Sequence, residues 1–561
     1  MKEQKSLIRE YALFLIGMIC ITIFSFWKCR YGLGNNDEPF YLTIPYRMTQ
    51  GDKLFFHEWH VSQAAAFFLF PLMKIYLLIF KNTVGIIIHF RYIYICVNAI
   101  VTMFAYRRLK KYGLSAGVVC ILYFLFVPFN IMALSYNSIG LASNFLCTVF
   151  LLTADEKKKT DYIIAGIFFA MMVLCQPILS LIFCIEVAIA MIYAKFKKKK
   201  LMIQEILYFF TGCVIAAIPV VMYLVIKVGV TNVLAVIPQI LNDPEHTGAG
   251  DIRSLCHNIV RLYIPEKQII IGKLSFNVKV ILKMLYCLFG VIWISAIIDR
   301  KTRRKAKIAI SAMLAIGISS CYLIFIQNSY INFLLFPWVL HSITMFLMET
   351  DKNVRKKIGI VWMIGFSHAA AFLGSNQYGY VFNIAFIPTS LISILLSLRE
   401  KESRKITGIC VFVTFIFLSY ARIEHVFWQT PPQTLTEQCS DGSVKGLYVS
   451  EETKEFYEKQ IEDIRKKNID KNDKILFLTN NTFLPLEVNG SIAQYSCWLS
   501  GVNENTFKRL ETYYTMIPEK IPNKVYIGKE YVDKQTIIEW TEQNGFHIEE
   551  SEISYFLEKD I

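Results

Sequence analysis

The first polar segment of the chain contains the side chains best suited to chemistry. Asp37 and Glu38 stand side by side soon after an apolar segment, 10–27. Carboxylates close to hydrocarbon are unfavourable unless they have a partner or a task. A carboxylate placed there could take the proton from an acceptor hydroxyl or amine, as a general base does. The alternative is a solvated loop or a helix cap, because Asp is a good N-cap residue.

A second cluster, His57, Glu58 and His60, follows twenty residues later between aromatic side chains. Carboxylate and imidazole are suitable ligands for a divalent metal ion, and either can bridge to a phosphate. The spacing is not that of the helical histidine pair of metalloproteases, and aromatic side chains also anchor proteins at membrane surfaces. Metal binding and interfacial anchoring both remain open for this cluster.

A further polar segment spans 242–267 and begins with a group that includes His246. Arg253, His257 and Arg261 follow at spacings of four, which places them on one helix face. Such a row could bind a lipid-linked phosphate, and a solvated helix face explains it equally well. A later turn could hydrogen-bond a sugar or only satisfy its own backbone; it contains Asn376, Gln377 and Tyr378.

Composition indicates which elements must position these groups. Of 561 residues, 55% are hydrophobic and 18% are charged, against roughly 45–50% and 25% in soluble domains. This excludes a soluble enzyme, a disordered chain and a disulfide-rich secreted domain. The sequence predicts an all-α polytopic membrane protein with about thirteen transmembrane helices, at 10–27, 84–106, 115–133, 137–153, 162–176, 178–194, 204–227, 278–298, 307–326, 330–348, 357–374, 380–398 and 406–421.

The distribution of charge predicts the orientation of these helices. The net charge is +15, yet residues 423–561 carry −9 and the first 422 residues carry +24 in short runs beside apolar segments. This pattern follows the positive-inside rule and places the amino end in the cytoplasm. It is not the contiguous basic face of a nucleic-acid-binding protein. The topology is consistent only if 63–81, which contains Pro71 and Lys74, lies as a helix in the outer interface.

Two domains are predicted. Residues 1–422 form the membrane domain, with outer loops at 28–83 and 228–277, and residues 423–561 form a small extracytoplasmic α/β domain. Local patterns in the tail predict two helices, 451–467 and 534–544, two strands, 474–479 and 524–528, and a strand pair at 546–556. No catalytic motif is evident in the tail. Cys439 and Cys497 both lie in it and could pair.

Residues 37–113 resemble the start of GT-C glycosyltransferases, nearest the branch of protein O-mannosyltransferases and lipid A aminoarabinose transferases. The predicted topology, with thirteen spans and an outer C-terminal domain, also resembles that of the bacterial members of this family. One departure is Trp59-His60-Val61, where the family has Lys-Pro-Pro after its glutamate. The matching residues are Asp37, Glu38, Tyr41, Gly51, Asp52, Glu58, Gly85 and Arg91.

The resemblance implies a glycosyltransferase of the plasma membrane that uses a polyprenyl-phosphate sugar donor, no nucleotide cofactor and no nucleic acid. The acceptor is an unidentified glycan, lipid or protein on the outer face. Asp37 would be the catalytic base of an inverting displacement and Glu38 its partner. Glu58 and His246 would bind a divalent metal ion or phosphate. Lys53, Arg253 or Arg261 would replace the missing lysine.

Two other functions remain open. A lipid-linked glycan polymerase or ligase is also many-spanning and outward-facing, but usually has its catalytic groups in a long late loop. A flippase or transporter of a lipid-linked sugar should show broken helices and polar groups near the middle of the membrane. The gathering of polar groups on the outer side favours the transferase.

Overall fold

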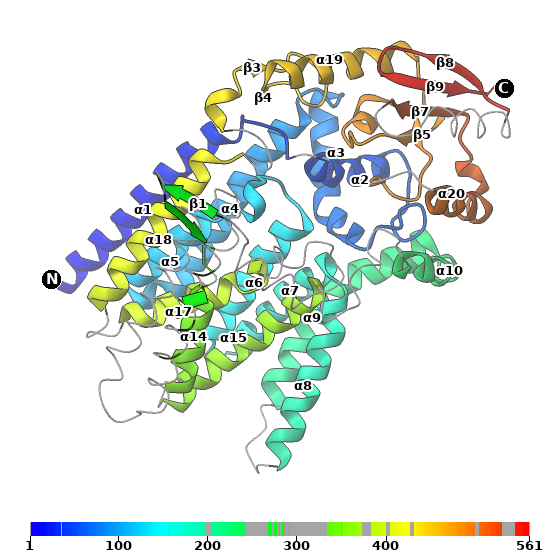
Figure 1. Ribbon diagram of the computed structural model, residues 1–561. Coiled ribbons are helices and arrows are strands. Elements are labelled where there is room, and N and C mark those ends of the chain that lie inside the picture. The colour runs from blue at the N-terminus through cyan, green and yellow to red at the C-terminus, as the bar shows by residue number, and fades with distance from the viewer. Residues whose placement is uncertain are drawn as a thin grey trace.

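The protein consists of a bundle of long apolar helices and a C-terminal β-sheet at the opposite end from the amino terminus, as seen in the computed structural model of Figure 1. The structure describes residues 2–34, 36–155, 158–196, 203–242, 268–271, 274–277, 334–335, 337–348, 351–372, 383–399, 404–426, 431–499, 504–529 and 545–559, and single residues between 280 and 291.

The helices of the bundle account for most of the described chain. They are α1 (Lys2–Lys28), α4 (Ile86–Leu109), α5 (Leu114–Leu125), α6 (Tyr136–Thr153), α7 (Lys159–Cys175), α8 (Ile178–Phe196), α9 (Ile203–Tyr223), α14 (Pro337–Met348), α15 (Lys352–Ala371), α17 (Ile387–Arg399) and α18 (Arg404–Glu424). Seven segments of the described chain are long and apolar enough to cross a membrane: Ile8–Lys28, Gln63–Phe80, Ile86–Tyr112, Tyr136–Thr153, Ile178–Phe196, Ile203–Val228 and Arg404–Glu424. The protein is thus a helical membrane protein, and the number of thirteen spans stays a prediction.

One predicted span, 115–133, is wrong because it is not one continuous helix. The segment 115–133 forms a helix, α5, that ends at Leu125. Val127 is extended, with φ −127° and ψ 118°, and Pro128 begins a short 3-10 turn. Proline disfavours the helical conformation of the residue before it and lacks the N–H that a helix requires. Residues 126–133 of the segment therefore do not continue the helix.

The segment 63–81 is helical, as expected. It contains a 3-10 turn (Gln63–Ala65) followed by α3 (Ala66–Phe80). Leu69 and Met73 on one face are buried, while Leu78 and Ile79 are exposed. The segment is also long and apolar enough to span, so its interfacial placement stays a prediction.

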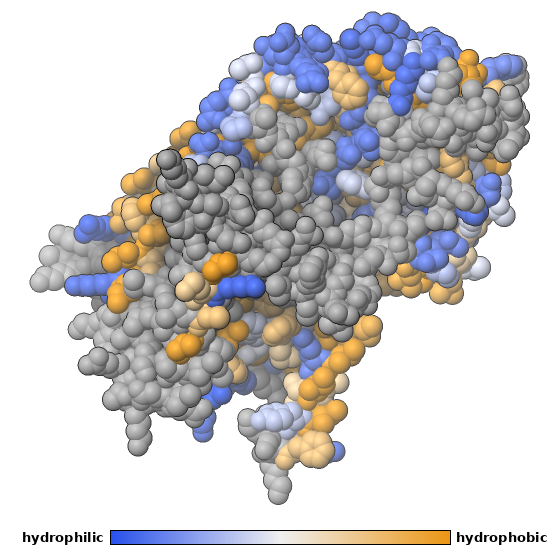
Figure 2. Space-filling view, viewed as in Figure 1, coloured by the Kyte–Doolittle hydropathy of each residue, from blue (hydrophilic) through white to orange (hydrophobic). Residues whose placement is uncertain are grey.

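Basic groups gather at one end of the bundle. Arg108 near the end of α4 pairs with Asp161 at the start of α7, at 2.9 Å. Lys357 in the first turns of α15 donates to the carbonyl of Leu152 near the end of α6, also at 2.9 Å. The C-terminal sheet lies at the other end (Figure 1). In Figure 2 the hydrophilic surface lies over the C-terminal part, and apolar side chains lie on the helices below it.

Two glycines let α7 and α9 touch through their backbones. A Cβ added at Gly166 would lie 1.9 Å from the carbonyl oxygen of Phe209, and one at Gly212 would lie 1.9 Å from that of Ile163. Helices in membranes associate through such small residues because close packing, rather than the hydrophobic effect, holds them together. The two positions form a reciprocal contact.

We expect Gly166→Ala and Gly212→Ala each to lower the thermal unfolding temperature of the purified protein, because each added methyl group must push the two helices apart. Gly408→Ala is the matched control, since a Cβ at that helical glycine meets nothing within 4 Å. Differential scanning fluorimetry in detergent would measure the three variants. Equal unfolding temperatures would contradict the close contact.

The C-terminal part contains a five-stranded sheet with strand order β6-β5-β7-β9-β8. β5 runs parallel to β6 and β7, and β9 pairs antiparallel with β7 and β8. The strands are β5 (Lys474–Leu478), β6 (Ser491–Ile492), β7 (Lys524–Gly528), β8 (His547–Glu550) and β9 (Ser554–Glu558). A separate antiparallel pair is formed by β3 (Glu437–Gln438) and β4 (Tyr448–Val449).

Most local predictions for the tail are confirmed. Helix α19 (Glu451–Lys466), strands β5 and β7, and the β8–β9 pair occupy the expected positions. A further helix, α20 (Glu504–Met516), was not predicted, and the expected helix at 534–544 lies outside the described residues. Cys439 and Cys497 are free, buried thiols.

The C-terminal sheet shares its core with both outer loops. Trp59 of the first loop is completely buried among residues of the sheet and α20, such as Leu476 and Tyr513. Helix α10 (Val230–Leu241) of the second loop contributes Val236 and Ile240 to the same core. This end of the molecule is therefore one folded unit built from three distant segments.

Candidate active site

Asp37 is the first residue of helix α2 (Asp37–Thr49). A carboxylate there is favoured by the partial positive charge of the helix amino terminus. Its side chain is half-buried, and no described residue hydrogen-bonds or pairs with it. Burial raises the pKa of Asp37 to about 7. A carboxyl group with a pKa near neutrality and no partner among the described residues is suited to accept a proton.

Two tyrosines accompany Asp37. The rings of Tyr41 and Tyr136 lie 5.6 Å apart and nearly perpendicular. Burial, and after it the charge of Asp37, raises the pKa of the Tyr41 phenol well above its usual value. This phenol therefore stays protonated, and it is hydrogen-bonded to Tyr136. Tyr136, at the start of α6, was not among the candidates from sequence.

Glu38 points elsewhere and forms a buried ion pair with Arg91 of α4. The Nε and Nη2 atoms of Arg91 lie 2.6 Å from Oε1 and Oε2 of Glu38. Arg91 also donates to the carbonyls of Cys29 at 2.5 Å and Gly32 at 2.8 Å. The backbone N–H of Gly34 donates to Glu38 Oε2 at 2.8 Å. Both oxygens of Glu38 are thus engaged in holding 29–34 against α4.

This arrangement separates the two neighbouring carboxylates. The resemblance implied that Glu38 assists Asp37 in the chemistry, whereas its contacts here are those of a structural anchor. Gly34 is required beside it, because a Cβ at that position would lie 2.8 Å from Cβ of Glu38. Of the two carboxylates, only Asp37 forms no hydrogen bond or ion pair with a described residue. Only Asp37 therefore remains available to a substrate.

A second buried network is centred on Arg47, near the end of α2. Its Nε lies 2.6 Å from Oδ2 of Asp52, and its Nη1 lies 2.7 Å from Oε2 of Glu58. Its Nη2 donates to the carbonyls of His57 at 2.9 Å and Gln494 at 3.1 Å. The guanidinium therefore joins two acids of the first loop, Asp52 and Glu58, to the C-terminal part.

Lys520 completes the network from the C-terminal side. Its Nζ donates to Oδ1 of Asp52 at 2.5 Å, to Oγ of Ser491 at 2.6 Å and to the carbonyl of Ile492 at 3.0 Å. Burial disfavours the charged form of Asp52, but Arg47 and Lys520 outweigh it and hold the pKa of this carboxyl below its usual value. Asp52 is therefore a charged link between the first loop and the tail.

Glu58 and Nδ1 of His57, two of the groups proposed as metal ligands, are engaged with protein partners. Glu58 accepts from Arg47 and from the backbone N–H groups of His60, at 3.2 Å, and Cys497, at 3.3 Å. Nδ1 of His57 accepts from the N–H of Lys53 at 3.0 Å. Burial lowers the pKa of His57 to about 4, so its ring is neutral near pH 7.

His60 and Lys53 have separate surroundings. Nδ1 of His60 accepts from the N–H of Ser62 at 3.1 Å, and its ring lies 4.7 Å from that of Phe40. The side chain of Lys53 is half-exposed. Within the described part of the chain, no group of three or more His, Cys, Asp or Glu side chains is arranged to hold a metal ion. Metal binding stays a prediction.

The remaining candidates lie outside the described residues, so their approach to Asp37 also stays a prediction. They are His246, Arg253, Arg261, Asn376, Gln377 and Tyr378. Sequence reasoning missed Arg47 and Lys520. The position of Arg47, a single cation followed by two nearby acids, was an available signal, whereas nothing around Lys520 pointed to Asp52.

No protein-family model matches the chain, and no curated protein is found to be similar to it. The fold therefore defines only the class of the protein: a helical membrane protein in which the loop after α1, helix α10 and the C-terminal sheet form one unit. The half-buried carboxylate of Asp37 lies at the start of a helix in that unit. Any more particular function is inferred from its chemistry.

Proposed function

We propose that the protein is a GT-C-type glycosyltransferase that moves a sugar from a polyprenyl-phosphate donor to an acceptor on the outer face of the plasma membrane. The observation that carries the proposal is Asp37, a half-buried carboxylate with a raised pKa and no partner among the described residues. The motif resemblance of residues 37–113 supports the same reaction class.

In this reaction Asp37 removes the proton from the acceptor hydroxyl or amine. The acceptor atom then attacks the anomeric carbon of the donor sugar and forms the new bond. The bond from that carbon to the phosphate oxygen breaks, and polyprenyl phosphate leaves with the electron pair. The phenol of Tyr41 stays protonated and is hydrogen-bonded to Tyr136, and both phenols feel the charge of Asp37.

The orientation follows from the two ends of the bundle. The end that contains Arg108 and Lys357 faces the cytoplasm by the positive-inside rule. The end with Asp37 and the C-terminal sheet then faces outward, where lipid-linked sugars rather than nucleotide sugars are available. The amino terminus is cytoplasmic and the carboxyl terminus extracytoplasmic in this arrangement.

Donor turnover by the purified protein tests the proposal. We expect protein in nanodiscs to release polyprenyl phosphate from at least one member of a panel of radiolabelled polyprenyl-phosphate sugars. The measurement is thin-layer separation of lipid and product, with heat-denatured protein as the control. Transport of a lipid-linked sugar across liposomes without any turnover would contradict the transferase and favour a flippase.

A further inference from the structure

A polar cleft of about 590 Å³ lies between the first outer loop and the C-terminal part, away from Asp37. Its volume is in the range of about 300–1,000 Å³ that is typical of ligand pockets. One wall comes from the end of α2 and the turn after α3, and the other from the end of α19 and the chain before β6. The lining includes Tyr46, Gln50, Lys81, Lys471, Glu487 and Asn489.

Hydrogen bonds hold the two walls together. Oγ1 of Thr83, after α3, donates to the carbonyl of Leu486 at 2.6 Å. The phenol of Tyr46 in α2 donates to the carbonyl of Val488 at 2.8 Å. All four residues line the cleft. The cleft is therefore a preformed site rather than a loose gap between two bodies.

The cleft has a surplus of positive charge. Lys81 and Lys471 are exposed, and neither forms an ion pair with the described residues. The buried carboxylate of Glu487 is engaged by Arg465 at 3.0 Å and by the N–H of Ser443 at 2.6 Å. Two lysines thus remain to bind an anion, and an ammonium group binds phosphate well.

Gln50 adds an uncharged group that needs a hydrogen-bond donor. Gln50 lines the cleft, and its buried Oε1 has no hydrogen-bond donor among the described residues. A buried acceptor without a donor is unfavourable by about 1–3 kcal/mol. A hydroxyl group of a ligand would satisfy it. The cleft therefore presents an acceptor for hydroxyl groups together with cations for an anion.

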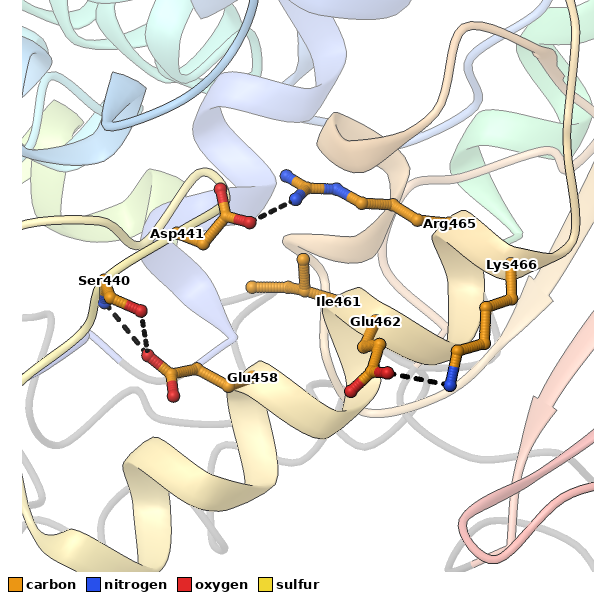
Figure 3. A pocket seen from close by; sticks show the side chains of 7 residues that line it. All are labelled: Ser440, Asp441, Glu458, Ile461, Glu462, Arg465 and Lys466. Carbon is orange, nitrogen blue, oxygen red and sulfur yellow. Dashed lines mark hydrogen bonds and ion pairs between the residues drawn. The ribbon is translucent and has the colours of Figure 1, made fainter.

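A neighbouring cleft, of about 460 Å³, differs from the first in how its charged groups are paired (Figure 3). Its charged groups pair with groups of the same cleft: Asp441 with Arg465, Glu458 with Ser440 at 2.6 Å, and Glu462 with Lys466 at 2.8 Å. Figure 3 shows these side chains directed at one another. The charged groups of this second cleft are paired with one another. In the first cleft, Lys81 and Lys471 form no ion pair with the described residues.

We propose that the cleft at Lys81, Lys471 and Gln50 binds a phosphate-bearing polyhydroxylated group. Two sources share this chemistry: a lipid headgroup such as that of phosphatidylglycerol, and a soluble phosphorylated polyol. Lys81 follows α3, whose residues Leu78 and Ile79 are apolar and exposed, so the predicted interfacial position of α3 would put the cleft near the bilayer surface. The site does not depend on whether Asp37 is a catalytic base.

Equilibrium binding of glycerol 3-phosphate to the full protein in phosphatidylcholine nanodiscs tests the site. We expect saturable binding that Lys81→Ala/Lys471→Ala weakens at least tenfold and that high salt also weakens. The control Lys445→Ala/Lys466→Ala removes two lysines outside the cleft and should change the affinity less than twofold. Wild type should prefer glycerol 3-phosphate to inorganic phosphate, and Gln50→Leu should lose this preference.

The same measurement in phosphatidylglycerol nanodiscs distinguishes the sources. If the lipid headgroup is the occupant, glycerol 3-phosphate binds at least tenfold more weakly in phosphatidylglycerol nanodiscs. If a soluble polyol phosphate is the occupant, the affinity for glycerol 3-phosphate is the same in both kinds of nanodisc. Absence of saturable binding in phosphatidylcholine nanodiscs would overturn the proposal. So would equal losses in the cleft variant and the lysine control.

Discussion

Asp37→Asn is expected to lower the rate of sugar transfer by about 10²–10⁴-fold, the usual contribution of a general base. The amide has nearly the shape of the carboxylate but cannot accept the acceptor's proton. No ion pair with a described residue is lost, because none is formed. Donor turnover at saturating substrate, with wild type and variant in the same nanodiscs, is the measurement.

Glu451→Gln is the matched control for this variant. Glu451 is also a carboxylate in the first turn of a helix, α19, but it is exposed in the C-terminal part. Its replacement should leave transfer within twofold of wild type. Full activity of Asp37→Asn would keep the reaction class open and remove Asp37 from its centre.

The pH dependence follows from the raised pKa of Asp37, which lies at about 7. The base form predominates above this value, so kcat/KM should rise with pH through about 7 and level off above it. Burial disfavours the charged form, so the corresponding loss of stability appears as pH rises from about 4 to about 7. Asp37→Asn should therefore unfold at a temperature no lower than wild type at pH 8.

Arg47→Met is expected to destabilise the part of the molecule that contains the C-terminal sheet by about 3–5 kcal/mol, the range for removing one member of a buried ion pair. The substitution leaves Glu58 buried without its cation and leaves Asp52 with Lys520 alone. The C-terminal sheet should then become sensitive to protease at a lower temperature, which limited proteolysis on a temperature gradient would detect.

Two comparisons make this result specific to the network. Lys459→Met removes an exposed pair with Glu552, at 3.4 Å, and should cost about 1 kcal/mol or less. Adding Asp52→Asn and Glu58→Gln to Arg47→Met should recover part of the loss, because the uncompensated charges are gone. Equal protease sensitivity of Arg47→Met and Lys459→Met would show that the network does not hold the tail.

The neighbouring carboxylates show where sequence reasoning reached its limit. Asp37 and Glu38 were singled out together, because charge near hydrocarbon is a signal that the sequence displays directly. Their separate tasks depend on Arg91, which lies 53 residues after Glu38 and approaches it only through the packing of α2 against α4. The partner of Asp52 was even harder to infer from the sequence, because Lys520 is 468 residues away along the chain.

The sequence by itself determined the class of the protein and the local elements of its tail. Apolar segments in a membrane must satisfy their backbone hydrogen bonds internally, so long apolar runs form helices whatever their neighbours. Short apolar runs such as 474–478 form strands for similarly local reasons. Only the tertiary structure decided that Glu38 is an anchor, that Arg47 joins the first loop to the tail, and that a charged cleft opens between them. Such contacts are electrostatic and depend on distance in space, and spacing along the chain does not report it.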